Sequence, residues 1–238
     1  MNSSPSTTLL ELGGNLRAEL RLKLLLTFVL NLYFYFPYGI LQGHRFFPPT
    51  EIAPTFLDHL IPFSDKAVWI YFSIFLLMPV GPLLMRRREQ LFRYAAGILL
   101  IETVAYLVFF FWPTWCARPK VTNTIAAYRI LITVDSQLNA FPSLHAAFAV
   151  FSAFCAAQVF RELRIHIWWR IIVGVWAILI LVGTLLTKQH TAVDIVGGSA
   201  IGLAIYRLVF SPRVFRFKMR MSSSIVAEPT IRSSSTAL

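Results

Sequence analysis

Six long apolar runs with few or no charged residues constrain the fold of this chain more than any other feature. A membrane-spanning helix needs roughly 17–25 predominantly apolar residues. The first five runs have that length, and the sixth reaches it when it is extended from His190 to Phe210. The runs are Leu24–Leu41, Ala67–Met85, Tyr94–Trp115, Ser136–Phe160, Ile171–Thr187 and Ile195–Tyr206. Because 57% of the residues are hydrophobic, against about 45–50% in soluble domains, the sequence predicts an all-α integral membrane protein, a bundle of six transmembrane helices.

The lysines and arginines predict the orientation of this bundle. Six spans place both termini on one side, and 16 of the 22 basic residues fall on that side. Cytoplasmic loops carry the excess of Lys and Arg in membrane proteins, so we expect both termini in the cytoplasm. The six basic residues expected on the opposite side are Arg45, Lys66, Arg118, Lys120, Arg129 and Lys188.

The net charge of +11 is therefore mostly a consequence of topology. The run Arg86–Arg88 is interpreted as an anchor against anionic headgroups, and no nucleic-acid partner is expected.

The chain divides into three expected segments. Residues 1–23 form a cytoplasmic N-terminal segment, residues 24–210 the six-helix membrane domain, and residues 211–238 a basic and then disordered cytoplasmic tail. The first apolar run is too long and too far from the N-terminus for the core of a signal peptide, so it is interpreted as a retained span. Cys116 and Cys155 are expected at different depths, so no disulfide is predicted between them.

Three ionisable residues stand at helix ends on the same, non-cytoplasmic side. His145 heads the fourth span, while His190 and Asp194 head the sixth. Ionisable groups at membrane depth are costly and are kept mainly where they line a polar cavity or perform chemistry. Spans joined by short loops pack as antiparallel neighbours. We therefore expect the three residues to meet in one pocket.

The spacing of these residues suggests nucleophilic chemistry. His190 and Asp194 are four residues apart, so on a helix they share one face, and Asp194 can orient one ring nitrogen while the other attacks. Pro142 and Ser143 are typical of a helix start, where the amides of Ser143 and Leu144 would suit a phosphate. The cations available on this side are Arg118, Lys120, Arg129 and Lys188, and an arginine binds a phosphoryl group bidentately.

Other interpretations remain open at this stage. Two histidines and one carboxylate are also a ligand set for zinc or iron, but nearby cations would repel a metal, so no metal or cofactor is expected. The protein could instead bind or transport lipid without catalysis. Glu102, in the middle of the third span, is as compatible with a structural role as with a proton path.

The residues around these positions resemble the motifs of the phosphatidic acid phosphatase type 2 superfamily, six-helix membrane enzymes that cleave or transfer lipid phosphates. The similarity covers roughly residues 44–207 and is strongest at Asn139-Ala140-Phe141-Pro142-Ser143-Leu144-His145 and at Lys188-Gln189-His190-Thr191-Ala192-Val193-Asp194. It implies a phosphohistidine mechanism with His190 as nucleophile, Asp194 orienting it and His145 as general acid and base. Arg118, in Arg118-Pro119, matches the end of the first motif of the family.

Several positions depart from the phosphatase pattern of that superfamily. Phe111 stands where a basic residue is usual, Gly183 and Thr184 replace Ser-Arg, and Leu144 replaces a glycine. These differences resemble the branch of inositol phosphorylceramide synthases and sphingomyelin synthase-like proteins. Phosphate binding is then expected from Arg118, with Lys120, Arg129 or Lys188 and the helix start at Ser143 and Leu144.

The resemblance also implies the partners and the location. The substrate would be a membrane lipid phosphate, and the acceptor either water or a lipid alcohol. We expect a multi-pass membrane protein, in the inner membrane if it is bacterial, with its active site facing a periplasm, the exterior or a lumen. The identity of the lipid and the oligomeric state stay open.

Overall fold

The computed structural model describes residues 13–44 and 46–210, and the tail expected at 211–238 and residues 1–12 lie outside this range. Six segments in the described part are long and apolar enough to cross a membrane, as the sequence predicts. The second of them combines the short helices η1 (Asp65–Ala67), α4 (Val68–Phe72) and α5 (Ile74–Leu84). The other five are single helices: α2 (Leu20–Gly43), α6 (Arg88–Phe111), α8 (Leu144–Glu162), α9 (Ile167–Leu186) and α10 (Ala192–Val209).

Most helix ends differ by a few residues from the boundaries of the apolar runs, and the two largest shifts of a helix start have a local cause. Hydropathy alone places the start of the third span at Tyr94, but helix α6 starts at Arg88. Its additional first turn suits solvent because Glu89 and Arg93 pair across one turn at 2.7 Å. Helix α8 starts only at Leu144, because Ser143 is its N-cap and its Oγ accepts the amide of Ala146 at 3.2 Å. The apolar residues before Ser143 form a loop at the end of the bundle.

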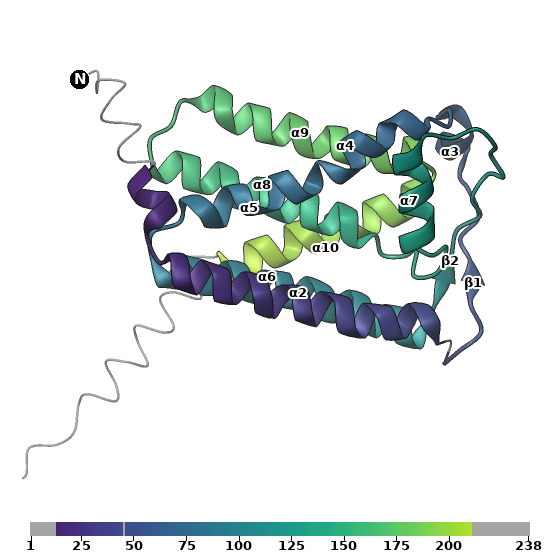
Figure 1. Ribbon diagram of the computed structural model, residues 1–238, viewed down its shortest axis with the longest axis horizontal. Helices are drawn as coiled ribbons and strands as arrows, with labels where there is room; N and C mark the ends of the chain where they lie inside the picture. The colour runs from purple at the N-terminus through teal and green to yellow at the C-terminus, as the bar shows by residue number, and fades with distance from the viewer. Residues whose placement is uncertain (1–12, 45, 211–238) are drawn as a thin grey trace, which may run out of the picture.

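The spans lie side by side along the long axis of the molecule (Figure 1). Helix α8 contacts α5, α9 and α10, and α2 packs mainly on α6. Helices α8 and α10 approach most closely at two glycines. A Cβ atom on Gly198 would lie 2.1 Å from the carbonyl oxygen of Ser143, and one on Gly202 would lie 2.4 Å from that of Ala147. This main-chain contact sets the separation of the two helix starts.

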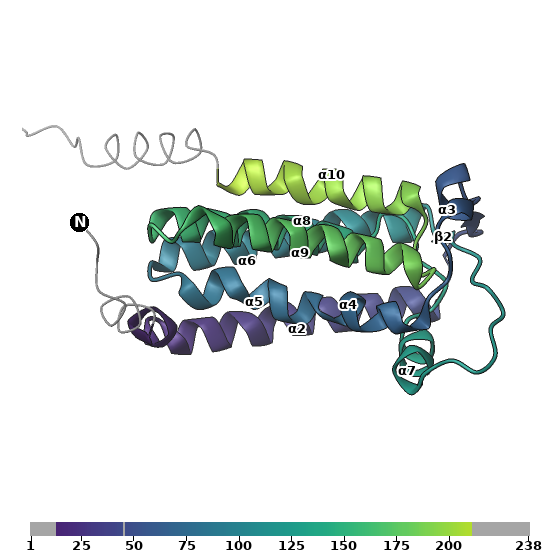
Figure 2. The ribbon, with the colours of Figure 1, turned by 90° about the horizontal axis from the view of Figure 1, so that it is seen from above.

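One end of the bundle carries two further helices and a pair of short strands (Figure 2). It holds α3 (Phe56–Leu60), α7 (Ala126–Val134) and a parallel pair of two-residue strands, β1 (Thr50–Glu51) and β2 (Thr114–Trp115). The sequence analysis predicted none of these short elements. The described chain begins and ends at the opposite end of the bundle (Figure 1).

The core lies where α5, α6, α8 and α9 meet, and it includes the fully buried Leu77, Ile101, Phe151 and Ile180. Large apolar side chains on the outside are exposed, as the stripe Leu24, Phe28, Leu32 and Phe36 on α2 shows. These four residues recur every four positions and so share one helix face. An exposed apolar stripe of this kind is typical of a surface that faces lipid.

Candidate active site

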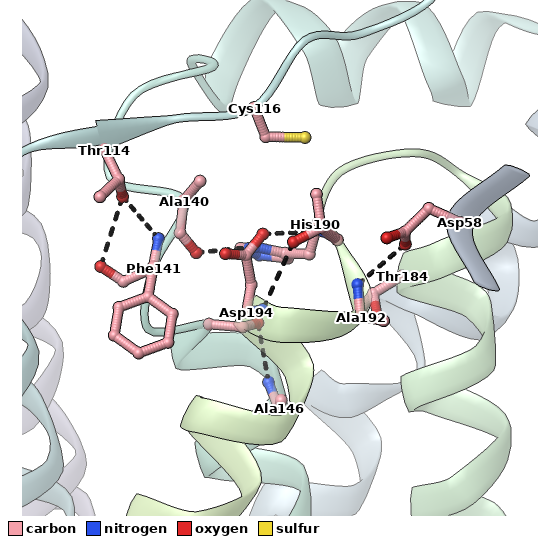
Figure 3. A network of polar contacts seen from close by, with 12 residues as sticks. Asp58, Thr114, Cys116, Ala140, Phe141, Ala146, Thr184, His190, Ala192 and Asp194 are labelled. Carbon is pink, nitrogen blue, oxygen red and sulfur yellow. Dashed lines mark hydrogen bonds and ion pairs between the residues drawn. The ribbon is translucent and has the colours of Figure 1, made fainter. Parts of the chain in front are cut away.

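His190 is held by a main-chain carbonyl from the loop before α8. Its Nδ1 lies 3.1 Å from the carbonyl oxygen of Ala140 and 3.8 Å from Oδ2 of Asp194 (Figure 3). Only the shorter distance is a hydrogen bond. A carbonyl can only accept, so Nδ1 carries the proton and Nε2 keeps its lone pair. Nε2 is therefore the ring nitrogen of His190 that can act as a nucleophile.

Asp194 belongs to the first turn of α10 and caps that helix. Its Oδ2 accepts the amide of Thr191 at 2.7 Å, and Oγ1 of Thr191 accepts the amide of Asp194 at 3.4 Å, which is a capping box. The expectation that His190 and Asp194 share a helix face is therefore wrong, because the cap at Thr191 leaves His190 just outside the helix. The Asp194 carboxylate still lies close enough to stabilise a positive charge on the ring. The Thr-x-x-Asp pattern in the sequence could have revealed this boundary.

His145 lies in the first turn of α8 and rests on Tyr71 of α4. Its Nε2 lies 2.8 Å from the carbonyl oxygen of Tyr71, and the two rings stack with centroids 3.8 Å apart and an interplanar angle of 17°. The hydroxyl of Tyr71 in turn donates to Oδ2 of Asp135 at 3.4 Å. Nε2 is thus a donor, and Nδ1 is the nitrogen left for a substrate. Nothing in the sequence pattern pointed to Tyr71.

The starts of α8 and α10 meet, but the expected common pocket is lined by His145 and His190 and not by Asp194, which is fully buried behind them. The amide of Ser143 donates to the carbonyl oxygen of Asp194 at 3.1 Å, so this amide is already engaged. The next two amides, of Leu144 and His145, have no hydrogen-bond partner among the described residues. Unpaired amides at the N-terminus of a long helix form a binding site for an anion.

His145 and His190 line one cavity of about 720 Å³. The cavity extends from the two histidines to Lys23 and Leu83 near the far end of the bundle. Its walls come from α2, α5, α6 and α8 and are mainly apolar, with side chains such as Phe34, Phe75, Ile98 and Phe148. A cavity of this size and composition suits a hydrocarbon chain with its polar group at the histidines.

Asn139 is a residue of this cavity that the sequence analysis did not single out. It is buried, has a positive φ of 61° and lines the cavity together with both histidines. Its Nδ2 has no hydrogen-bond partner among the described residues. A buried amide donor without a partner at this position is available to an oxygen of a bound phosphate.

The four cations that were predicted to bind phosphate do not line this cavity. The side chain of Arg118 is only 8% exposed and donates from Nη1 to the carbonyl of Asp135 at 2.7 Å and from Nη2 to that of Ser136 at 2.8 Å. Lys188 donates from Nζ to the carbonyls of Asp58 and Ile61, at 2.7 and 2.5 Å. The structure thus places both side chains in contacts that hold loops.

The two remaining cations are at the surface. Lys120 is exposed, and Arg129 is exposed and donates to the carbonyl of Thr124. Neither lines the cavity.

Asp58 is a second residue that the sequence analysis missed. Its Oδ1 accepts the amide of Ala192 at 2.8 Å, and its Oδ2 accepts the amide and the hydroxyl of Thr55, both at 2.7 Å (Figure 3). Asp58 and Lys188 together fasten α3 over the start of α10. The pattern Thr55-x-x-Asp58 is a second capping box and was the available signal.

Cys116 and Cys155 are both free thiols, and both are buried. Burial raises the pKa of the Cys116 thiol to about 12, and the negative charge of Asp194 adds to this shift. The thiol is therefore protonated at neutral pH. The described residues include no group of three or more His, Cys, Asp or Glu side chains that could hold a metal ion.

A family model of the PAP2 superfamily matches residues 44–208, which is more than half of the chain and includes Asn139, His145, His190 and Asp194. The chain belongs to the PAP2 superfamily. No curated protein and no solved structure gives a significant match. Membership in the PAP2 superfamily supports an enzyme of the phosphatase or phosphotransferase type that acts on phosphoesters.

Proposed function

We propose that this PAP2 protein cleaves or transfers the phosphate group of a membrane lipid through a phosphohistidine on His190. The observation that carries the proposal is the position of His190. Its Nδ1–H is donated to the carbonyl of Ala140, its Nε2 is free, and its ring lines an apolar cavity shared with His145. This arrangement presents one nucleophilic nitrogen at the end of a chamber that suits a lipid chain.

The first step uses both histidines. Nε2 of His190 attacks phosphorus, and the bond from phosphorus to the lipid oxygen breaks. His145 in its protonated form gives the leaving oxygen a proton from Nδ1, while its Nε2–H stays on the carbonyl of Tyr71. The stacked ring of Tyr71 stabilises the imidazolium by a cation–π interaction. The carboxylate of Asp194 stabilises the charge that develops on His190.

The second step returns both rings to their starting state. His145 removes a proton from the acceptor, and the acceptor oxygen attacks phosphorus as the phosphorus–nitrogen bond breaks. The amides of Leu144 and His145, the amide group of Asn139 and the dipole of α8 stabilise the phosphoryl oxygens. Arg118 would join them if its guanidinium turned from the carbonyls of Asp135 and Ser136.

A panel of substrates tests this proposal. The purified protein is offered phosphatidic acid, polyprenyl phosphates and a phosphoinositol lipid, each with and without ceramide or diacylglycerol. Free phosphate and transferred headgroup are measured separately. Turnover of at least one lipid phosphate is expected, and no turnover of any together with no trapped phosphoenzyme would overturn the proposal.

Headgroup transfer to a lipid alcohol, as in the inositol phosphorylceramide synthase branch, is the second candidate. It is favoured by the scarcity of cations around the cavity. Thr184 is buried within α9 and donates to the carbonyl of Leu181, and Phe111 is exposed at the end of α6. Neither position supplies the positive charge that the phosphatase pattern has there. Product that appears as transferred headgroup only when a lipid alcohol is present would support this candidate.

A metal-dependent reaction is the third candidate, because His145, His190 and Asp194 are all possible ligands. Activity is expected to survive a strong chelator. Loss of activity with chelator, followed by rescue with zinc or iron, would favour the metal site and exclude the phosphohistidine mechanism.

A further inference from the structure

Glu102 of α6 is a buried carboxyl group for which the described residues supply no hydrogen-bond partner. The residue is only 2% exposed, and its Oε2 is buried without a hydrogen-bond partner in the part of the chain that the structure describes. It also lines the cavity that reaches His145 and His190. Burying an unpaired carboxyl group costs free energy. The cavity therefore contains a polar group that only an occupant of the cavity can satisfy.

The neighbouring hydroxyl groups are engaged elsewhere. Tyr94 donates to the carbonyl of Met78 and Tyr106 to that of Phe34, each at 2.9 Å. Thr103 lies 2.6 Å from the carbonyl of Leu99 and 2.9 Å from the hydroxyl of Tyr33. A hydroxyl has a single proton to give. These side chains therefore leave Glu102 unpaired.

The depth of Glu102 follows from the packing of α6 on α8. The hydroxyl of Tyr94 lies 3.3 Å from Oγ of Ser152, which aligns the two antiparallel helices at this level. Glu102 lies eight residues after Tyr94 on α6, which is about 12 Å along the helix. His145 lies seven residues before Ser152 on α8, which is about 10 Å toward the same end of the bundle. Helical side chains lean toward the N-terminus of their helix. The carboxyl group of Glu102 therefore lies somewhat deeper than the ring of His145.

We propose that Glu102 accepts a hydrogen bond from a hydroxyl or amide N–H group that the lipid substrate carries a few carbons from its phosphate. This inference rests on the proposed function, since it takes the phosphate to lie at His190. The site then selects lipids with a donor near the headgroup, such as phosphates of hydroxylated long-chain bases. Diacyl lipids whose ester groups only accept hydrogen bonds leave Glu102 unpaired.

A matched pair of substrates tests the selection. The full chain in detergent is given two alkyl phosphates of equal length, one with a hydroxyl on the third carbon and one without. The wild-type protein is expected to prefer the hydroxylated substrate by about 10- to 100-fold in kcat/KM. Glu102→Leu should bring the ratio close to one, and Glu102→Gln, which keeps an acceptor oxygen, should retain most of the preference.

Ser199→Ala is the matched control, because Oγ of Ser199 is also buried without a partner but Ser199 does not line the cavity. Its substrate ratio should equal that of the wild type. A wild-type ratio near one, or an unchanged ratio in Glu102→Leu, would overturn the role of Glu102 while leaving the proposed function intact.

A measurement without turnover separates the two proposals. In detergent alone, Glu102→Leu is expected to raise the Tm, because it removes a buried unpaired polar group. A non-hydrolysable hydroxylated alkyl phosphonate should raise the Tm of the wild type more than its plain analogue does, and the difference should vanish in Glu102→Leu. If no lipid phosphate is turned over, the proposed function fails, and equal Tm shifts from the two phosphonates would then also reject the role of Glu102.

Discussion

At the scale of single residues, both histidine rings are oriented by main-chain carbonyls of other elements. Ala140 accepts from His190, and Tyr71 accepts from His145. A main-chain acceptor fixes the tautomer independently of any side chain. The contribution of Asp194, 3.8 Å from His190, is then electrostatic stabilisation of the ring and capping of α10. Both contacts are made by Oδ2, whereas Oδ1 of this fully buried residue has no hydrogen-bond partner among the described residues.

The two histidines should fail in different ways when each is replaced by alanine. His190→Ala is expected to abolish turnover and any phosphoenzyme. His145→Ala should lower turnover of a lipid phosphate by about 10²- to 10⁴-fold, yet still form phosphoenzyme from an aryl phosphate, because a good leaving group needs little protonation. Rapid quench with radiolabelled aryl phosphate measures the phosphoenzyme, and equal loss in both variants would contradict the division of roles.

Asn139 should contribute to phosphate binding through its unpaired amide group. Asn139→Gly keeps the positive φ accessible but removes the donor, so kcat/KM is expected to fall by about tenfold or more. Asn139→Asp has nearly the same shape and places a negative charge near the phosphate, so its loss should be larger. The Ki for vanadate should rise in the same order. Wild-type kinetics in both variants would remove Asn139 from the site.

At the scale of secondary-structure elements, the contact between α8 and α10 determines the geometry of the site. His145 and Ser143 belong to the start of α8, and Asp194 to the start of α10. The glycines of α10 allow these two starts to touch, since any side chain there would meet main-chain atoms of α8. Main-chain atoms of a packed helix cannot move aside as a flexible side chain can.

Gly202→Ala should therefore destabilise the protein. The added Cβ would lie 2.4 Å from the carbonyl oxygen of Ala147, and overpacking of this kind typically costs about 1–3 kcal/mol. Gly174→Ala on α9 is the control, because nothing lies within 4 Å of its added Cβ. Thermal unfolding in detergent should show a lower Tm for Gly202→Ala and an equal or higher Tm for Gly174→Ala. An unchanged Tm for Gly202→Ala would contradict the close contact.

At the scale of the whole molecule, the bundle has two chemically different ends. The end near the histidines carries α3, α7 and the strand pair (Figure 1). The opposite end holds the start of α6 and the end of α8, where Arg86–Arg88 and Arg161 lie. We propose from the positive-inside rule that the arginine-rich end faces the cytoplasm. The candidate site would then open on the non-cytoplasmic side.

Labelling of single cysteines tests this orientation. Thr122 lies in the loop near α7 and Arg161 at the far end of α8, and both are exposed. In a background without Cys116 and Cys155, Thr122→Cys should react with an impermeant maleimide applied to the non-cytoplasmic side. Arg161→Cys should react only after the membrane is permeabilised, and the reverse pattern would invert the proposed topology.

The sequence by itself determined the number of spans, their order and the pairing of two polar helix starts. A charge-free run of sufficient length is a local property of the sequence. The positions of His145, His190 and Asp194 near the ends of such runs can be read from the order of residues along the chain. The capping boxes at Thr55 and Thr191 were also readable, since each depends on residues three positions apart. The box at Thr191 places the start of α10 after His190, so this local rule is enough to predict that His190 lies outside the helix.

The tertiary structure decided which groups the site residues contact. Tyr71 lies 74 residues from His145 and Ala140 lies 50 residues from His190, and both act through carbonyl oxygens that every residue possesses. A main-chain acceptor leaves no signature in side-chain identity, so no sequence pattern could have indicated it. The same holds for Lys188, whose ammonium group turns to carbonyls of α3 and its following loop instead of to the cavity. Long-range packing, which brings distant segments to one end of the bundle, is what selects these partners.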